Sequence, residues 1–199
     1  MQIPRRFPDW QVPFVVALAC VVAAAWGDVA RELLRYDRLA IAGGDYWRLL
    51  SGHFVHLGYA HLALNLAGLL LVWLLVGRRY GSRQWLLVTA ISVAVMDGGF
   101  WWLDEGLRWY VGLSGLLHGL LLAGAIRGLR SLPAESVVIC VAVVAKLVYE
   151  QVAGPLPGSE SAAGGAVVVN AHLYGAVGGA LSAGSLWRRI PTEAFEEQV

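Results

Sequence analysis

Long apolar stretches alternate with short polar stretches along nearly the whole chain. A helix that crosses a bilayer needs roughly 20 predominantly apolar residues. Six segments come close to that length, at 12–30, 59–77, 84–103, 112–127, 134–153 and 168–187. Across the 199 residues, 58% are hydrophobic and 15% are charged, whereas a soluble domain carries about 25% charged residues. The pattern predicts an all-α membrane protein, built as a bundle of six transmembrane helices.

The basic residues predict how this bundle is oriented. Arginines gather at four places that share one side of the membrane if there are six crossings: Arg5 and Arg6; Arg78, Arg79 and Arg83; Arg127 and Arg130; Arg188 and Arg189. The positive-inside rule makes that side cytoplasmic, so we expect both termini there. The loop at 31–58 then lies outside, where acidic residues partly offset its arginines. We expect one transmembrane domain over 1–190 and a short cytoplasmic tail over 191–199.

Three sets of polar residues interrupt the apolar segments at similar depth, toward the outer side. His61 and Asn65 are four residues apart, so they share one face of the second helix. Ser114 and His118 share a face of the fourth helix in the same way, and His172 lies near the outer end of the sixth. Polar residues are costly in lipid and usually face the protein interior. We therefore expect these side chains to meet in one water-accessible cavity.

The residue types in these sets fit the chemistry of a serine hydrolase. A serine becomes a good nucleophile when a base takes its proton, and neutral imidazole suits that role near pH 7. The tetrahedral intermediate needs donors, which Asn and His side chains and a backbone N–H at a helix N-terminus supply. Gly112 and Gly115 flank the serine and permit a tight turn and a close backbone approach. Because the fourth helix is short, we expect a loop to dip down to its first residue.

Taken in chain order, these residues resemble the motifs of rhomboid intramembrane serine proteases. Four motifs carry the resemblance: GLSG at 112–115 as GxSG, His61 and Asn65 as HxxxN, Ala171 and His172 as the AH pair, and Trp47 and Arg48 as the WR pair of the first loop. The resemblance covers the six-helix core in both motif order and topology. It implies a rhomboid-like fold with both termini in the cytoplasm.

The resemblance implies a role for each matching residue. Ser114 would be the nucleophile and His172 the general base, in a dyad that requires no aspartate. His61, Asn65 and the backbone N–H of Ser114 would form the oxyanion hole.

Three supporting residues follow from the same resemblance. Gly175 and Gly179 would form the small-residue face on which the last helix packs against the serine helix. His118 stands where many rhomboids have a tyrosine that stacks on the catalytic histidine. We expect His118 to stack there or to form a hydrogen bond.

The compact length and the strings around Ser114 and His172 look most like one bacterial branch, the rhombosortases. That resemblance implies membrane-anchored protein substrates with a Gly-Gly motif and a C-terminal transmembrane tail. It also implies the bacterial inner membrane, with an active site that opens to the periplasmic side. The alternatives are a general rhomboid protease with another substrate and an inactive rhomboid-like binding protein. A transporter is disfavoured because the chain has no internal repeat.

Cofactors and nucleic acid have no support in the sequence. The net charge of +1 gives no basis for a nucleic-acid partner. His53, His56 and His61 lack the spacing of a standard zinc site, so we expect no metal. We expect His53 and His56 instead to organise the cavity mouth through hydrogen bonds.

Two charged residues in other helices call for partners. Asp97 and Lys146 lie at similar depth in the third and fifth segments, so we expect an interior ion pair or a shared water network. Glu150 is an alternative partner for Lys146, four residues along the same helix. The glycine-rich connection at 154–167 would cap the active site and gate access to it.

Overall fold

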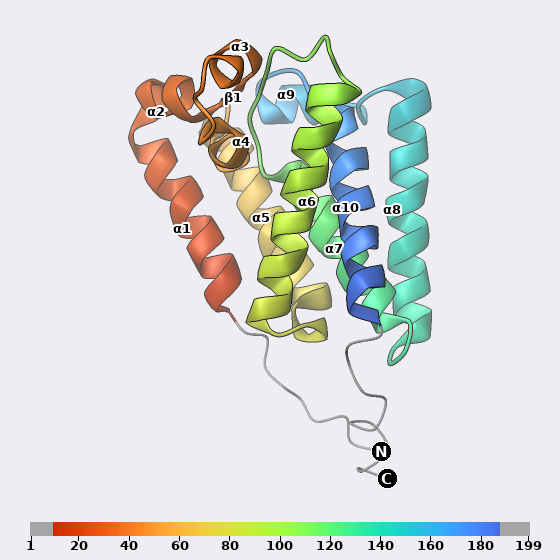
Figure 1. The fold of residues 1–199 in the computed structure, drawn as a ribbon. Coiled ribbons are helices and arrows are strands. Elements are labelled where there is room, and N and C mark those ends of the chain that lie inside the picture. The colour runs from red at the N-terminus through yellow and green to blue at the C-terminus, as the bar shows by residue number, and fades with distance from the viewer. Residues whose placement is uncertain (1–9, 188–199) are drawn as a thin grey trace.

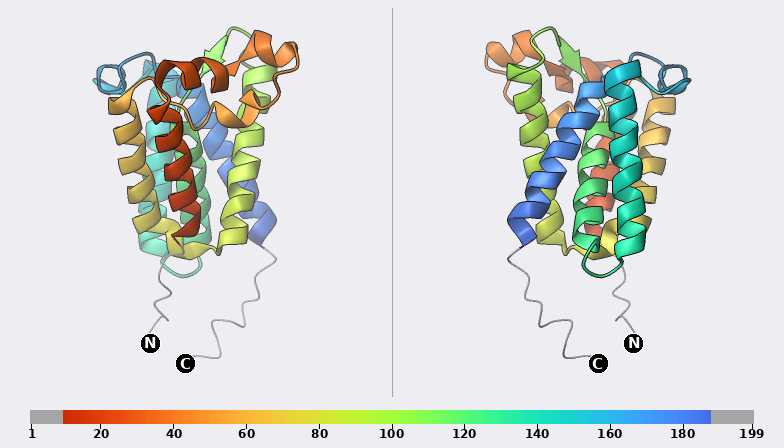
Figure 2. Two further views of the ribbon diagram at one scale, coloured as in Figure 1. Left: turned by 90° about the vertical axis from the view of Figure 1, so that its left-hand side faces the viewer. Right: turned by 90° about the vertical axis from the view of Figure 1, so that its right-hand side faces the viewer.

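Each predicted apolar segment contains one long helix in the computed structural model, which describes residues 10–187. These helices are α1 (Gln11–Ala25), α5 (Tyr59–Val76), α6 (Ser82–Trp102), α7 (Ser114–Gly128), α8 (Pro133–Ala153) and α10 (Val169–Trp187). They run side by side, and α1 begins and α10 ends at the same end of the bundle (Figures 1 and 2). A helix satisfies all its backbone groups internally, which lipid demands. The predicted helical bundle is confirmed.

Fewer than six helices meet a strict test for membrane crossing. Within residues 10–187, three are long and apolar enough: Tyr59–Arg79, which adds the short turn η1 (Gly77–Arg79) to α5, Ser82–Trp102 and Pro133–Ala153. The bent pair of α1 and α2 (Gly27–Leu34) makes a fourth if it counts as one span. Ten of the 15 residues of the short α7 are buried, and nine of the 19 residues of the glycine-rich α10. Six crossings and cytoplasmic termini stay predictions, and the predicted tail at 191–199 lies outside the described residues.

The first predicted segment, 12–30, is not one straight helix. The chain bends by 115° where α1 gives way to α2. Gly27 lies at the bend with a φ of 62°, a conformation that favours glycine. Asp28, Arg31 and Glu32 follow at once, and such charges are costly inside a bilayer. The helix therefore turns, and α2 crosses the end of the bundle (Figure 1).

The region predicted as a long outer loop, 31–58, contains regular structure. It holds β1 (Tyr36–Asp37), α3 (Arg38–Ala42) and α4 (Arg48–Ser51), and β1 pairs antiparallel with β2 (Trp109–Tyr110). Arg48 is buried and joins the segment together, because its guanidinium donates to Glu32 O at 2.8 Å and to Asp45 Oδ2 at 3.0 Å. These short elements gather at one end of the bundle, with α9 (Ser159–Ala163) beside them (Figure 1).

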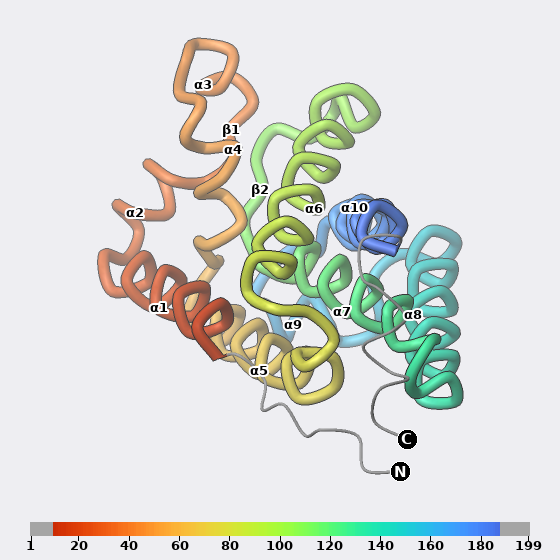
Figure 3. Tube along the Cα trace, turned by 60° about the horizontal axis from the view of Figure 1, so that its bottom comes forward, coloured from red at the N-terminus to blue at the C-terminus, as the bar shows by residue number. Residues whose placement is uncertain are grey.

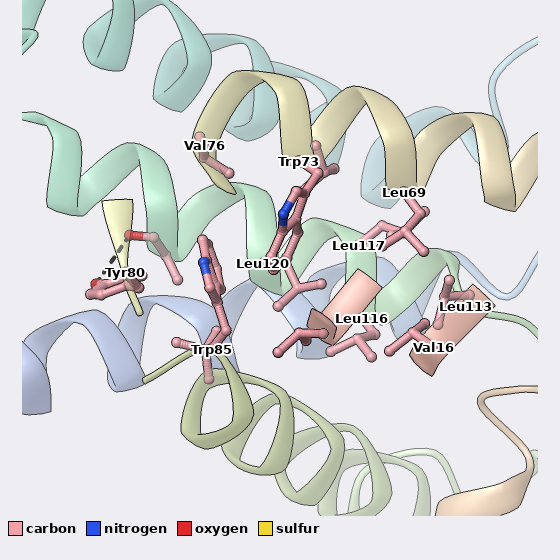
Figure 4. Close-up of a cluster of buried hydrophobic side chains, with 14 of the residues drawn as sticks. Val16, Leu69, Trp73, Val76, Tyr80, Trp85, Leu113, Leu116, Leu117 and Leu120 are labelled. Atoms are coloured by element: carbon pink, nitrogen blue, oxygen red, sulfur yellow. Dashed lines mark hydrogen bonds between the residues drawn. The ribbon is translucent and has the colours of Figure 1, made fainter. Parts of the chain in front are cut away.

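Helix α7 lies at the centre, in contact with α5, α6, α8 and α10 (Figure 3). Leu113, Leu116 and Leu120 are almost fully buried in a cluster that also contains Trp73 and Trp85 (Figure 4). The two indole rings lie 5.1 Å apart. Lipid tails are as apolar as leucine, so close packing rather than exclusion of water holds such a core together. This packing makes α7 a firm support for Ser114, its first residue.

Candidate active site

Ser114 begins α7 at the lower end of a loop that descends from α6 (Figure 1). The hydroxyl of Tyr110 donates to Gly112 O at 2.6 Å, and the N–H of Gly112 donates to Gly52 O at 3.2 Å. Gly112 has a φ of 126°, which side chains disfavour. These contacts fix the backbone just before the serine. The expected descending loop is therefore present.

His172 lies in the first turn of α10 and reaches Ser114 from the neighbouring helix. Its Nε2 is 3.0 Å from Ser114 Oγ, although the two residues are 58 positions apart. The imidazole is buried, with 5% of its residue surface exposed. The distance is within hydrogen-bond range, so Nε2 is placed to accept the hydroxyl proton.

Glycines on α7 and α10 allow this approach. A Cβ atom on Gly175 would collide with the carbonyl of Gly115, and one on Gly179 would collide with the carbonyl of Gly119. The two backbones therefore touch where any larger residue would separate them. Because Gly115 directly follows the serine, this contact sets the height of His172 relative to Ser114.

His61 and Asn65 approach the serine from α5. The N–H of Leu57 donates to His61 Nδ1 at 3.4 Å, which leaves the ring proton on Nε2. A Cβ atom on Gly112 would lie 3.1 Å from that Nε2, so the ring edge lies beside the loop that precedes the serine. Asn65 is buried and its Nδ2 donates to His61 O at 3.0 Å. The ring edge of His61 thus lies beside Gly112, two residues before the serine, with Asn65 one turn further along α5.

A cavity of about 290 Å³ opens beside these residues. Ser114 and His61 line it together with Leu57, Tyr110 and the segment 166–168 that follows α9. A Cβ atom on Gly165 would lie 2.8 Å from Leu57 Cδ1, so this segment packs on the cavity rim. The connection expected to cap the site thus contributes to the cavity wall, and capping and gating by it stay predictions.

His118 lies against the face of His172. The two rings are stacked, with centroids 4.4 Å apart and planes inclined by 23°. His118 Nδ1 is 2.7 Å from Ser114 O, an acceptor that requires the N–H to be on Nδ1. Of the two interactions expected for His118, the structure therefore contains both.

The predicted ion pair between Asp97 and Lys146 is absent. Asp97 Oδ1 lies 3.2 Å from His53 Nε2, whereas Lys146 Nζ donates to Glu150 Oε1 at 2.7 Å. Asp97 is on α6 and Lys146 is on α8, and both helices pack on α7 and α10. Similar depth therefore did not mean proximity. The alternative partner for Lys146, Glu150, is the correct one.

Sequence reasoning missed the position of Glu150 relative to the candidate base. Its Oε2 lies 2.9 Å from His172 Nδ1, and Lys146 Nζ lies 3.4 Å from the same nitrogen. The signal was present in the spacing of Val143, Leu147 and Glu150, which are the buried residues of the last turns of α8. A glutamate in register with buried apolar residues faces the bundle interior.

One group of side chains could hold a metal ion by distance. Within residues 10–187, ligand atoms of His118, Glu150 and His172 lie within 4.8 Å of one another. The ammonium of Lys146 already neutralises the Glu150 carboxylate. His53, His56 and His61, which lie close together in the sequence, form no such group among residues 10–187.

His56 differs from His53 in how it is held. Its ring lies edge-on to His61, with centroids 5.0 Å apart, and neither ring nitrogen has a hydrogen-bond partner among the described residues. Burial, together with the neighbouring His61, lowers the pKa of His56 to about 4. His56 is therefore neutral at pH 7. The expected hydrogen-bonding role fits His53 and not His56.

Fold and site together define a helical membrane protein with a serine–histidine pair beside a cavity. Residues 43–189 match the family model described as Rhomboid domain, and the chain belongs to the rhomboid family of multi-pass membrane proteins. It is 29% identical over 116 residues to the putative rhomboid protease YdcA of Bacillus subtilis (strain 168), covering 55% of this chain and 58% of that protein.

A second relative matches over a shorter stretch. The chain is 48% identical over 48 residues to rhomboid protease GluP of the same organism, covering 24% of this chain and 10% of GluP. The chain thus spans little more than half of one relative and a tenth of the other.

Proposed function

We propose that this chain is an intramembrane serine protease in which Ser114 is the nucleophile and His172 the general base. The observation that carries the proposal is the 3.0 Å separation of Ser114 Oγ from His172 Nε2, in a member of the rhomboid family. The cavity beside Ser114 supports it, because a peptide must reach the hydroxyl together with a water molecule. The two relatives described above are named as a rhomboid protease and a putative rhomboid protease.

The reaction follows from the two ring nitrogens and the hydroxyl. His172 Nε2 takes the proton of Ser114 as Oγ forms a bond to the scissile carbonyl carbon. The same proton then passes to the leaving amine as the C–N bond breaks, which leaves an acyl-enzyme on Ser114. Water attacks that ester by the reverse sequence of proton transfers and frees the carboxyl product.

The oxyanion of the intermediate needs donors on the side of the serine that faces α5. His61 Nε2–H and the backbone N–H of Ser114 are the donors that the geometry favours, since Leu57 occupies His61 Nδ1 and Ser114 begins a helix. In this proposal Asn65 adds its second amide hydrogen or orients His61, to whose carbonyl it is already bonded. Loss of one such donor typically costs a factor of about 10²–10³ in rate.

The finer parts of the proposal concern topology and substrate. Six crossings would place both termini in the cytoplasm of a bacterial inner membrane, with the cavity opening to the periplasmic side. The proposed substrates are membrane-anchored proteins with a C-terminal transmembrane tail and a Gly-Gly motif, as the rhombosortase resemblance implies. A small, apolar-lined cavity under the α9 segment is compatible with glycine at the cleavage site.

The test measures covalent labelling by a fluorophosphonate probe in detergent, followed by cleavage of a Gly-Gly-tailed membrane substrate. Wild type should be labelled and should release the substrate from its tail, while Ser114→Ala and His172→Ala should do neither. Ser182→Ala is the matched control, because Ser182 is a buried serine on α10 whose hydroxyl donates to Gly179 O. It should behave as wild type.

Two results would contradict the proposal at different levels. Equal labelling of wild type and Ser114→Ala, or no labelling of folded wild type, would remove the protease assignment. Labelled wild type that cleaves a tail with Leu-Leu as fast as one with Gly-Gly would keep the protease and remove the rhombosortase substrate.

A further inference from the structure

Glu150 occupies the side of His172 that faces away from the serine. Its Oε2 lies 2.9 Å from His172 Nδ1, while Ser114 Oγ lies 3.0 Å from Nε2. The three groups therefore form a continuous row of serine hydroxyl, imidazole and carboxylate. Glu150 is 3% exposed, so the carboxylate is removed from solvent at the point where it meets the ring.

The fold explains why a charged residue is accepted there. The buried residues of α8 are Ser136, Val143, Leu147 and Glu150, which share one face, and most of the other α8 side chains point outward. That face packs on α7 and α10, the helices that carry Ser114 and His172. A buried carboxylate is costly without a partner. Lys146 supplies it at 2.7 Å.

Lys146 and Glu150 compete for the same ring nitrogen, and distance decides between them. A neutral His172 Nδ1 either accepts from Lys146 or donates to Glu150. Glu150 Oε2 is 0.5 Å closer, at 2.9 Å against 3.4 Å for Lys146 Nζ. Lys146 already donates to Glu150 Oε1. The hydrogen on Nδ1 is therefore donated to Glu150, and the lone pair on Nε2 faces Ser114.

We propose that Glu150 is a positioning residue that extends the Ser114–His172 pair into a Ser–His–Glu triad, with Lys146 as the counter-ion of its carboxylate. The inference rests on the proposed function. Glu150 holds the imidazole in the tautomer that accepts the serine proton and stabilises the imidazolium formed when it does. A Lys–Glu pair four residues apart, whose carboxylate is buried, thus acts on the reaction as well as on the packing of α8.

Four side chains face His172. They are Ser114 and His118 from α7 and Lys146 and Glu150 from α8. Glu150 is the one carboxylate among these four. Replacing it with glutamine therefore removes the acceptor of the Nδ1 hydrogen and leaves the other three side chains in place.

The experiment compares second-order rates of fluorophosphonate labelling at one pH, in detergent with EDTA so that no metal replaces Lys146. Glu150→Gln should label about 10²–10⁴-fold more slowly than wild type, because an amide favours the wrong tautomer. Glu150→Asp restores a carboxylate and should recover at least about tenfold of the loss, which a merely structural role of Glu150 would not predict. Glu135→Gln, which changes an exposed glutamate near the other end of α8, should leave the rate unchanged.

Glu150→Gln leaves Lys146 as an unpaired charge, and a folding defect would hide the effect on the chemistry, so a second variant is required. Lys146→Met/Glu150→Gln removes both charges and replaces the ion pair with neutral groups. It should fold and still label at least 10²-fold more slowly than wild type. If either folded variant labels within about threefold of wild type, the triad is wrong. If wild type itself is not labelled, the proposed function fails instead.

Discussion

The stacked ring of His118 gives His172 a fixed plane. His172 is held at both ring nitrogens, by Ser114 and Glu150, but neither contact prevents rotation about the line that joins them. The ring of His118 stacks on that of His172 with centroids 4.4 Å apart, and its Nδ1 donates to Ser114 O. It therefore links the orientation of the base to the backbone of the nucleophile.

Substitution of His118 separates its ring from its hydrogen bond. His118→Ala should slow fluorophosphonate labelling by about tenfold, because an aromatic pair is worth about 0.5–1.5 kcal/mol. His118→Phe keeps a ring without a hydrogen bond and should stay within about threefold of wild type. Labelling rates of the two variants at one pH check this. A Phe variant as slow as the Ala variant would show that the bond to Ser114 O matters and the stacking does not.

Helices α7 and α10 form the element on which the site depends. Their glycines lie four residues apart on each helix, at Gly115 and Gly119 and at Gly175 and Gly179, and they meet backbone to backbone. Backbone atoms cannot move aside as a flexible side chain can. A single methyl group at this contact therefore shifts a whole helix, and with it the distance between Ser114 and His172.

Gly179→Ala tests this contact two turns away from the chemistry. The new methyl group would overlap the carbonyl of Gly119, and overpacking of this kind costs about 1–3 kcal/mol. We expect a lower thermal unfolding midpoint in detergent and slower labelling of Ser114. Gly184→Ala is the matched control on the same helix, because its Cβ would meet open space. That variant should be as stable as wild type or more so by about 0.5–1 kcal/mol. Equal midpoints for the two variants would contradict the close packing.

At the scale of the molecule, the helical segments followed from the sequence and their packing did not. Length and hydropathy predicted all six long helices, because each segment must pair its own backbone in lipid. The same measures gave the depth of a side chain along its helix but not the neighbouring helix that it faces. Asp97 was therefore assigned to Lys146, although its partner is His53. The bend at Gly27 was also missed, since an apolar count over 12–30 averages across the charges that follow it.

The candidate site was predictable where residues recur at helical spacing and not where it depends on a third helix. His61 and Asn65, or Ser114 and His118, share a face by their separation of four residues. The approach of Glu150 to His172 depends on how α8 is rotated about its axis, which only its packing on α7 and α10 determines. The dyad implied by the resemblance left no place for a carboxylate.

The arrangement of the whole bundle predicts which surfaces face which compartment. The α9 segment lies beside the cavity at one end, and the connection between α7 and α8 lies at the opposite end (Figure 2). In a chain whose own cysteines are replaced by alanine, the substitutions Ala162→Cys and Ala134→Cys each place one exposed thiol near one end of the bundle. A membrane-impermeant maleimide should label the Ala162→Cys variant in intact spheroplasts and the Ala134→Cys variant only after permeabilisation.

Two outcomes would contradict this topology. The reverse pattern would place the cavity in the cytoplasm, where exported proteins with periplasmic tails cannot reach it. Labelling of both thiols in intact cells would mean that the bundle does not separate its two ends across the bilayer, and the six-crossing topology would be wrong.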